Sequence, residues 1–285
     1  MDTFEAHRPY LFAIAYRMVG SVSEAEDLVQ ETYLRFRQVD EAQVASPKAY
    51  LSTIVTRLCL NYLNSAQVQR EHYPGPWLPE PLLITSDDEP AQASERLDSI
   101  SMAFLVLLEK LTPYERAVFL LRAVFNYDYE EIAAIIGKEA ATCRQHFSRA
   151  KKHLTDHRPR FEVQTEAHTE ITTRFLAACQ TGDLAGLEQL LAEEVVYVTD
   201  GGGKVGTPTI PIIGRNQVAR FLTAVIKQVP AGFRAELALI NGELGIVGRV
   251  NGEITGTAVL DIQNGHIQQI WALHNPDKLK HLVKG

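Results

Sequence analysis

The sequence predicts a multidomain protein in which two all-α modules are followed by an α+β domain. Apolar residues recur at helical spacing through residues 4–70 and again through 96–160. Between these modules lies a stretch rich in proline and acidic residues. From about residue 165, helices give way to strands separated by three Asn-Gly pairs, which are typical of tight antiparallel turns. The predicted boundaries are 1–70 for the first module, 71–95 for the linker, 96–160 for the second module and 165–285 for the last domain.

Two start signals define helices of the first module. Ser23, with Glu26 three residues later, has the spacing of a capping box, so a helix is expected to begin there. Ser46 followed by Pro47 predicts a second start, because proline is favoured at the first helical position. One face of the first of these helices carries the polar residues Asp27, Gln30, Glu31 and Arg35.

The second module ends in a predicted helix-turn-helix. Thr112-Pro113-Tyr114-Glu115 combines a capping box with a proline at the first helical position. Gly137 then separates two short amphipathic helices, because glycine adopts the left-handed conformation that ends a helix. The exposed face of the second helix has the residue types that reach base edges and phosphates in a major groove: Thr142, Arg144, Gln145, Ser148, Arg149 and Lys152. A helical hairpin with a solvated basic face is the alternative.

The charge is distributed unevenly along the chain. The net charge is −7, yet residues 138–160 contain seven Lys or Arg residues against Glu139 and Asp156. Because the acidic remainder repels phosphate, the protein should bind naked DNA weakly. Either it binds DNA on a large partner, or its DNA-binding face is covered.

Composition also limits the function classes. No apolar run is long enough to cross a bilayer, and MDTFEAHRPY has neither the basic start nor the apolar core of a secretion signal. A soluble cytoplasmic protein is therefore expected, with no membrane partner. Cys59, Cys143 and Cys179 are far apart and the nine histidines lack metal-ligand spacing, so we predict no metal and no cofactor.

The last domain has a mixed pattern of helices and strands. Predicted helices cover Thr169–Gln180, Asp183–Ala192 with Asp183 as N-cap, and Asn216–Gln228. Predicted strands cover Val195–Val198, Leu244–Val250, Ile254–Ile262 and His266–Leu273. The Asn-Gly pairs begin at residues 241, 251 and 264 and favour type I′ turns, which predicts an antiparallel meander.

The two helical modules resemble a known family. Residues Ser23–Phe36 (SEAEDLVQETYLRF) resemble region 2 of extracytoplasmic-function sigma factors, and Leu111–Leu154 resembles region 4. The resemblance covers about residues 4–157 and implies two partners, promoter DNA and core RNA polymerase, the latter through its clamp and flap. It further implies that the polar face of Asp27, Gln30, Glu31 and Arg35 binds the clamp.

The resemblance also assigns residues to promoter DNA. Residues 40–48, with Tyr50, Arg57 and Asn61 after them, match the part that opens and reads the −10 element. Tyr50 stands where the family usually has tryptophan, and the loop has few basic residues. The −35 element is assigned to Thr142, Arg144, Gln145, Ser148 and Arg149, with Lys151 and Lys152 placed on phosphates.

The last domain is similar to SnoaL-like cone folds, and the whole chain to sigma factors of the SigJ type, in which such a domain is fused. Three strings carry this likeness: WLPEPL (Trp77–Leu82), DGGGK (Asp200–Lys204) and NPDKL (Asn275–Leu279). We expect Trp77 to dock at the open end of the cone, since a rigid extended segment loses little entropy on docking. The predicted contact set is Trp77, Leu78, Pro79, Glu80, Asp200, Gly201, Gly202, Gly203, Lys204, Asn275, Pro276, Asp277 and Lys278.

The resemblance implies regulation in cis by this domain, which favours a monomer and leaves open a small-molecule or protein signal. For Trp77, packing on the helical modules is the alternative. For the domain, one alternative is a cone-fold enzyme, although Tyr197, Asp200, Asp261 and His274 show no diagnostic spacing and no catalytic residue is assigned. Another is a small-molecule sensor whose pocket is lined by Phe175, Phe221, Phe233 and Trp271.

For the whole chain, the alternatives are such an enzyme or sensor fused to a DNA-binding module, and a dimeric operator-binding factor. The polar face from Asp27 to Arg35 favours a sigma factor, because an operator-binding repressor needs no helix that docks on a polymerase clamp. A sigma factor is not an enzyme.

Overall fold

A computed structural model describes the chain except residues 1–2, 71, 84–100, 156–165 and 285. Parts of the predicted linker and both outer boundaries of the second module therefore lie outside the described residues. The chain divides into two compact units, the helical unit (residues 3–70, 72 and 104–155) and the C-terminal unit (73–83, 101–103 and 166–284). Across the described ranges, no helix combines the length and apolar character needed to span a bilayer.

The first module of the helical unit contains three α-helices, α1 (Thr3–Val19), α2 (Val22–Phe36) and α3 (Pro47–Arg70), with a short 3-10 helix η1 (Glu41–Gln43). The predicted start at Ser23 is wrong by two residues. Ser21 is the N-cap of α2, and its hydroxyl accepts a hydrogen bond from the backbone N–H of Glu24 at 3.3 Å. Ser21 rather than Ser23 is the N-cap because it has extended backbone geometry. It directly follows Gly20, whose φ of +69° ends α1. The start of α3 at Pro47 is confirmed, with the Ser46 hydroxyl 3.4 Å from the N–H of Ala49.

The second module contains α5 (Met102–Leu108), α6 (Pro113–Ala123), α7 (Tyr129–Ile136) and α8 (Ala140–Thr155). The predicted capping box at the start of α6 is confirmed, with Thr112 and Glu115 bonded reciprocally. Gly137 ends α7 with a φ of +67°, as predicted. The apolar stripe of α8 faces inward: Cys143, Ala150 and Leu154 are buried. Helices α7 and α8 therefore form the expected helix-turn-helix.

The two modules contact each other inside the helical unit. The Arg116 guanidinium is buried and donates to the carbonyl of Met18 and to Glu109, each at 2.6 Å. The Tyr127 hydroxyl donates to Ser52 of α3 at 2.8 Å and accepts from Tyr10 of α1 at 3.1 Å. These bonds join α1 and α3 of the first module to α6 and the α6–α7 loop of the second.

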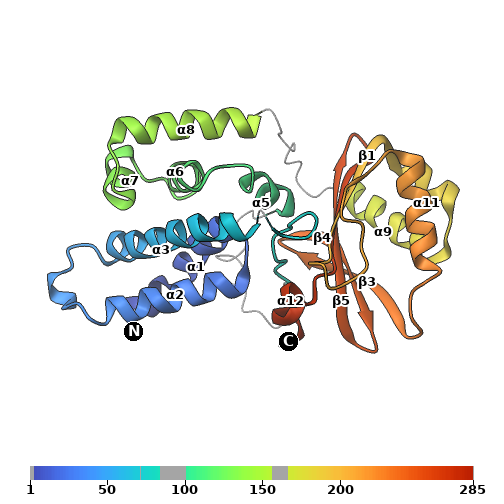
Figure 1. The fold of residues 1–285 in the computed structure, drawn as a ribbon, viewed down its shortest axis with the longest axis horizontal. Coiled ribbons are helices and arrows are strands. Elements are labelled where there is room, and N and C mark those ends of the chain that lie inside the picture. The colour runs from blue at the N-terminus through green and yellow to red at the C-terminus, as the bar shows by residue number, and fades with distance from the viewer. Residues whose placement is uncertain (1–2, 71, 84–100, 156–165, 285) are drawn as a thin grey trace. The chain divides into compact units, whose positions relative to one another are not determined.

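The C-terminal unit is an α+β domain, as predicted. Its helices are α9 (Glu166–Thr181), α10 (Leu184–Leu190), α11 (Arg215–Ile226) and the short α12 (Pro276–Leu279), followed by a 3-10 helix η2 (Lys280–Lys284). Its strands are β1 (Leu191–Asp200), β2 (Ile212–Ile213), β3 (Phe233–Ile240), β4 (Glu243–Val250), β5 (Glu253–Gln263) and β6 (His266–Leu273). They form one curved sheet in the order β2-β1-β6-β5-β4-β3, with α9 and α11 on one face (Figure 1).

The predicted meander is confirmed. Asn241, Asn251 and Asn264 each have a positive φ of 52–53°, and the glycine after each is also left-handed. These turns connect β3 to β4, β4 to β5 and β5 to β6, and all three strand pairs are antiparallel. The turn at Asn241 also contacts the linker, since the N–H of Asn241 donates to the carbonyl of Leu82 at 2.8 Å.

The predictions for β1 and α10 need correction. The helix ends at Leu190 rather than Ala192, and the strand begins at Leu191 rather than Val195. The stretch Ala192-Glu193-Glu194 favours a helix by propensity, but Leu191 pairs with Ile267 of the parallel neighbour β6. Strand pairing within the tertiary structure therefore outweighs local propensity here. Strand β2 was not predicted, because two residues carry no periodicity.

The core of the domain lies between the helices and one face of the sheet. It contains Phe175, Leu187, Val218, Ile246, Leu260, Ile270 and Ala272. Because Ile270 and Ala272 belong to this core, Trp271 between them points to the opposite face. The proposed sensor pocket of four aromatic residues is therefore wrong: Phe175 and Phe221 pack in the core, whereas Trp271 faces away from it.

Candidate functional site

The face of α8 assigned to the −35 element is largely exposed. Thr142 is half-buried, while the long side chains that follow it are accessible: Arg144, Gln145, Ser148, Arg149, Lys151 and Lys152. Helix α8 presents this face because Cys143 and Ala150 are completely buried on its other side. The structure thus brings all seven predicted residues onto one helix, with the apolar stripe turned inward.

Two residues of this face have partners in the protein. Arg144 forms an ion pair with Glu130 of α7 at 3.0 Å, and its guanidinium lies 5.2 Å from the centre of the Tyr129 ring. Lys151 lies over the Phe147 ring at 5.9 Å. Glu130 and Tyr129 thus orient Arg144, so the guanidinium is held in place before any DNA is bound.

The polar face of α2 is also accessible. Asp27, Gln30 and Arg35 are exposed, Glu31 is half-buried, and Arg35 donates to Glu31 at 2.8 Å. Leu34 is 47% exposed beside them, which is unusual for a large apolar side chain flanked by charges. Sequence reasoning missed Leu34, although a leucine off the buried stripe of an amphipathic helix was a usable signal.

The residues assigned to the −10 element lie along α3. Tyr50 and Asn61 are exposed, and the Tyr50 ring lies 6.3 Å from that of Phe36. Arg57 is engaged within the protein. Its Nε donates to the carbonyl of Ile135 at 2.7 Å and its Nη2 to that of Ala134 at 2.9 Å. These carbonyls belong to the last turn of α7, where a cation is favoured by the helix dipole and by unsatisfied acceptors.

The linker residues 73–83 lie on the C-terminal unit, where the carboxylate of Asp200 is their anchor. Oδ1 accepts from the hydroxyl of Tyr73 at 2.6 Å and from the N–H of Gly202 at 3.0 Å. Oδ2 accepts from the N–H of Leu78 at 2.9 Å and from the ammonium of Lys278 at 2.7 Å. The four donors saturate a carboxylate that is 1% exposed. We call the set Tyr73, Leu78, Asp200 and Lys278, together with Asn275, the linker anchor.

Lys278 completes this arrangement. Its ammonium also donates to the carbonyl of Leu78 at 2.6 Å, and the residue is 7% exposed. It lies 3.9 Å from the centre of the Trp77 ring and 5.1 Å from that of Tyr73. A desolvated cation between two aromatic faces gains more from this interaction than an exposed one. Trp77 is therefore a half-buried cover over Lys278, while its neighbour Leu78 is the deeply buried residue.

The remaining predicted contact residues lie around the anchor. Asn275 donates to the Tyr73 hydroxyl at 2.8 Å and caps α12 by accepting from the N–H of Asp277 at 3.0 Å. Lys204 and Lys280 both pair with Asp277, which holds the pKa of that carboxyl below its usual range. Pro79 and Glu80 are buried in the linker segment, and Pro276 is the first residue of α12.

Gly201, Gly202 and Gly203 lie so close to neighbouring atoms that none of them has room for a side chain. A side chain at Gly202 would meet the Asn275 amide at 2.3 Å, and one at Gly203 would meet the ring of Pro74 at 2.7 Å. Gly202 and Gly203 also have positive φ values of 60° and 68°. At Gly201 a side chain would meet Thr207 at 2.2 Å. Gly203 thus leaves room for the linker at Pro74, whereas Gly201 and Gly202 allow the loop to pack against Thr207 and Asn275 of its own domain.

Several linker contacts were missed from the sequence. Tyr73 is part of the anchor, and its pKa is raised by burial and by the hydrogen bond to Asp200. Beyond the anchor, Leu82 exchanges hydrogen bonds with Asn241 at 2.8 and 3.1 Å, and Leu83 forms a β-bridge with Ile240 at the edge of the sheet. The left-handed Asn241 of the β3–β4 turn thus has a second role as a contact for the linker.

The residues considered for catalysis do not form a site. Asp200 is consumed by the anchor, and Tyr197 packs in the core, where burial raises its pKa to about 12. His274 lies at the end of β6, and its burial lowers its pKa. The Asp261 carboxylate accepts from Gln263 at 3.0 Å. Each of the four therefore has a structural explanation.

Comparisons with known proteins agree with this organisation. Residues 3–68 match the family model described as Sigma-70 region 2, and residues 101–154 match Sigma-70, region 4. The chain is 36% identical to the ECF RNA polymerase sigma factor SigJ of Mycobacterium tuberculosis (strain ATCC 25618 / H37Rv), over 98% of this chain and 92% of the relative. It is 32% identical to a probable ECF RNA polymerase sigma factor, SigI, of the strain CDC 1551 / Oshkosh, over 98% and 94%.

The fold agrees over the same length. The crystal structure of Mycobacterium tuberculosis extracytoplasmic function sigma factor SigJ aligns with a TM-score of 0.79 and 33% identity, covering 97% of each chain. This alignment includes the C-terminal domain as well as the helical modules.

Proposed function

Because the chain belongs to the extracytoplasmic-function family of RNA polymerase sigma factors, we propose that its SnoaL-like domain controls promoter-dependent transcription in cis, through the linker anchor. Sigma factors bind core RNA polymerase and promoter DNA, and they are not enzymes. The proposal therefore concerns how this activity is limited by the rest of the chain.

The observation that carries the proposal is the saturated Asp200 carboxylate. The anchor holds residues 73–83 on the C-terminal unit, and α3 of the first module ends at Arg70. In the sequence, residues 71 and 72 connect α3 to this segment. The chain between regions 2 and 4 includes residues 73–83, so docking holds this part of the connection on the C-terminal unit. By binding residues 73–83, the C-terminal domain shortens the length of chain that can extend between regions 2 and 4.

A second observation concerns the contact between the two sigma regions. The −10 and −35 elements are separated by about 25 base pairs, or roughly 85 Å of duplex at 3.4 Å per step. Arg57, assigned to the −10 element, lies 2.7 Å from a carbonyl of α7 in the helix-turn-helix assigned to the −35 element. The two regions cannot keep this contact and span both elements, so we infer that it opens before promoter binding.

The polymerase and DNA contacts follow the family pattern. We propose that the α2 face around Asp27, Gln30, Glu31 and Arg35, with Leu34 added, docks on the polymerase clamp. Tyr50, Arg57 and Asn61 serve the −10 element. The exposed face of α8 serves the −35 element: Thr142, Arg144, Gln145, Ser148, Arg149, Lys151 and Lys152.

Run-off transcription with purified core polymerase tests the control in cis. The template carries the promoter upstream of the protein's own gene, and the full chain is compared with Asp200→Asn, with Asp277→Asn as the exposed control and with a chain ending after Leu154. Release of the linker should change transcript yield in Asp200→Asn and in the shortened chain, and should leave Asp277→Asn unaltered. Equal yields from all four proteins, with core binding intact, would remove the proposal.

A further inference from the structure

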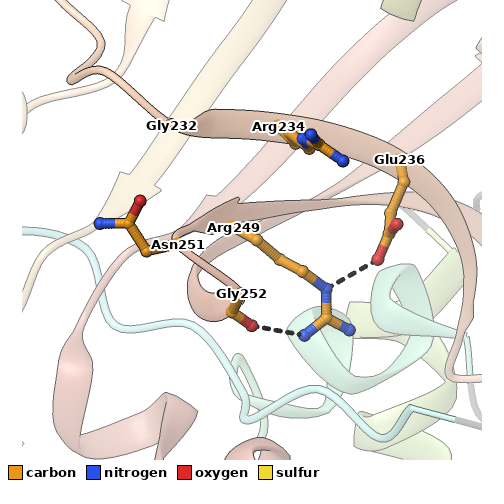
Figure 2. A pocket seen from close by; sticks show the side chains of 6 residues that line it. All are labelled: Gly232, Arg234, Glu236, Arg249, Asn251 and Gly252. Carbon is orange, nitrogen blue, oxygen red and sulfur yellow. Dashed lines mark hydrogen bonds and ion pairs between the residues drawn. The ribbon is translucent and has the colours of Figure 1, made fainter.

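A hollow on the C-terminal domain is lined by the residues Gly232, Arg234, Glu236, Arg249, Asn251 and Gly252 (Figure 2). Its volume is about 400 Å³. Ligand sites in proteins range from about 300 to 1,000 Å³, so this hollow has room for a small molecule or a single chemical group. It lies between the start of β3 and the end of β4, and it shares no residue with the linker anchor.

Two arginines lie directly opposite each other in this hollow. The register of β3 and β4 pairs Arg234 with Arg249, so both side chains leave the same face of the sheet. Like charges directly opposite on neighbouring strands are destabilising. Glu236, two residues along β3 on the same face, supplies one negative charge against two positive ones. The hollow therefore keeps a net positive charge in a chain whose net charge is −7.

Arg249 is held at a fixed orientation. Its Nε donates to Glu236 at 2.7 Å and its Nη1 to the carbonyl of Gly252 at 3.1 Å (Figure 2). Among the described residues Nη2 has no acceptor, so it is available to a ligand. The Gly252 carbonyl can approach because the β4–β5 turn is left-handed at Asn251 and Gly252.

Arg234 is the available partner. It is exposed, and no described residue accepts a hydrogen bond from its guanidinium or forms an ion pair with it. The backbone beside it is confined, since a side chain at Gly232 would meet the Asn251 carboxamide oxygen at 2.4 Å. An oriented arginine and a second, uncompensated one thus border the same space.

We propose that this hollow is a binding site for a compact oxyanion, with a phosphate group as the best fit, gripped between Arg234 and Arg249. A guanidinium presents its N–H groups as a planar fork that matches the oxygens of phosphate and carboxylate. Two such forks on neighbouring strands can donate to one tetrahedral anion from two sides. Glu236 orients Arg249 but also repels the anion, so it sets an upper limit on affinity.

The test is a calorimetric titration of the full chain with inorganic phosphate at constant ionic strength. Arg234→Gln should weaken binding about tenfold or more, because a charge-assisted hydrogen bond is lost. Glu236→Gln should strengthen binding, since it removes a negative charge and keeps an acceptor for Arg249. The matched control is Arg220→Gln, which removes the same charge from the exposed face of α11. Thermal denaturation checks that each variant folds.

Pyrophosphate and citrate serve as the other probes and distinguish the source of the anion. Tighter binding of pyrophosphate than of citrate identifies a phosphate-bearing ligand, and the reverse identifies a carboxylate-bearing one. Either result supports the oxyanion site if Arg234→Gln weakens it and Arg220→Gln does not. Absence of saturable binding to all three probes, or equal weakening by the two arginine substitutions, would overturn the proposal.

Discussion

Two internal contacts of this protein use similar groups and differ in their surroundings. In the helical unit, the exposed guanidinium of Arg57 donates to backbone carbonyls at the end of α7. In the C-terminal unit, the ammonium of Lys278 and the carboxylate of Asp200 are almost completely buried, and four donors saturate that carboxylate. Water or a DNA phosphate can replace the carbonyls around Arg57 at little cost. Opening the anchor would leave a buried charge without a partner, which is much less favourable.

The difference assigns distinct roles to the two contacts. We expect the linker anchor to persist, so that residues 73–83 stay on the C-terminal domain. We propose that the contact between regions 2 and 4 is the one that opens when the protein binds polymerase and promoter. Under the proposed control in cis, the outcome depends on how easily the contact between regions 2 and 4 opens while the anchor holds residues 73–83.

The largest effect is expected from breaking the anchor. Asp200→Ala leaves the ammonium of Lys278 buried and also removes the acceptor for Tyr73 and Leu78. The free energy of unfolding of the C-terminal unit should fall by about 3–5 kcal/mol. Urea denaturation followed by Trp fluorescence measures this loss, since Trp77 and Trp271 both belong to this unit. Asp277→Ala, which removes an exposed carboxylate nearby, is the control and should cost less than about 1 kcal/mol. A similar loss in the two variants would contradict the assigned difference between buried and exposed pairs.

A smaller, pH-dependent effect is expected at Glu243. Its carboxyl is half-buried near Asp261, and removal from water is the main reason that its pKa rises from 4.5 to about 7. The folded state therefore binds a proton more tightly than the unfolded state. The contribution of Glu243 to the free energy of unfolding is greatest below pH 4.5 and falls as the pH rises to about 7, by up to about 3 kcal/mol.

Glu243→Gln should remove this part of the pH dependence. The difference in unfolding free energy between the variant and the original protein, measured from pH 4.5 to 8, should grow with pH and level off above 7. Asp261 and the backbone N–H of Met102 face this carboxyl, and neither is altered by the substitution. A difference that stays constant over the whole range would show that Glu243 titrates normally.

The contact between regions 2 and 4 should be more easily weakened. Tyr127→Phe removes the hydroxyl that bonds Ser52 and Tyr10, and it leaves every residue assigned to DNA unchanged. The cost should be about 1–2 kcal/mol for buried hydrogen bonds. Because the open form is then favoured, transcription from a cognate promoter should increase at limiting protein concentration. Tyr33→Phe, on α2 and outside this contact, is the matched control; a decrease in transcription with Tyr127→Phe would argue that the contact supports promoter binding.

Features set by a few adjacent residues were predicted better than features set by distant partners. Local signals were reliable: the Thr112 capping box, the left-handed Gly137 and the Asn-Gly turns depend on a few adjacent residues, and all are confirmed. The helix start at Ser23 was wrong by two residues, because Ser21 and Ser23 both have a glutamate three residues later and so satisfy the same local pattern. The boundary between α10 and β1 was wrong because pairing with β6, far along the chain, determines it.

Long-range partners were the harder part of the sites. The strings DGGGK, NPDKL and WLPEPL were singled out, and residues from all three meet in the linker anchor. That Leu78 rather than Trp77 is the deeply buried residue could not be read from the string. Tyr73 was missed because it precedes the string and has no periodic pattern. Arg57 was assigned to DNA, and nothing in α3 indicated that α7 supplies its present acceptors.

The smallest effect on stability is expected at α8, where Arg144 forms an exposed ion pair with Glu130, in contrast to the buried pair of Asp200 and Lys278. Glu130→Gln removes the partner of Arg144, and both side chains are more than half exposed. Stability should change by less than about 0.5 kcal/mol, because screened surface pairs contribute little. Affinity for a −35 duplex should still rise slightly, since a negative charge near the phosphates is lost and Arg144 is released to the DNA. Fluorescence anisotropy at two salt concentrations measures this gain, which should shrink at the higher salt. A stability loss as large as that of Tyr127→Phe would mean that Glu130 holds the helix-turn-helix together rather than merely orienting Arg144.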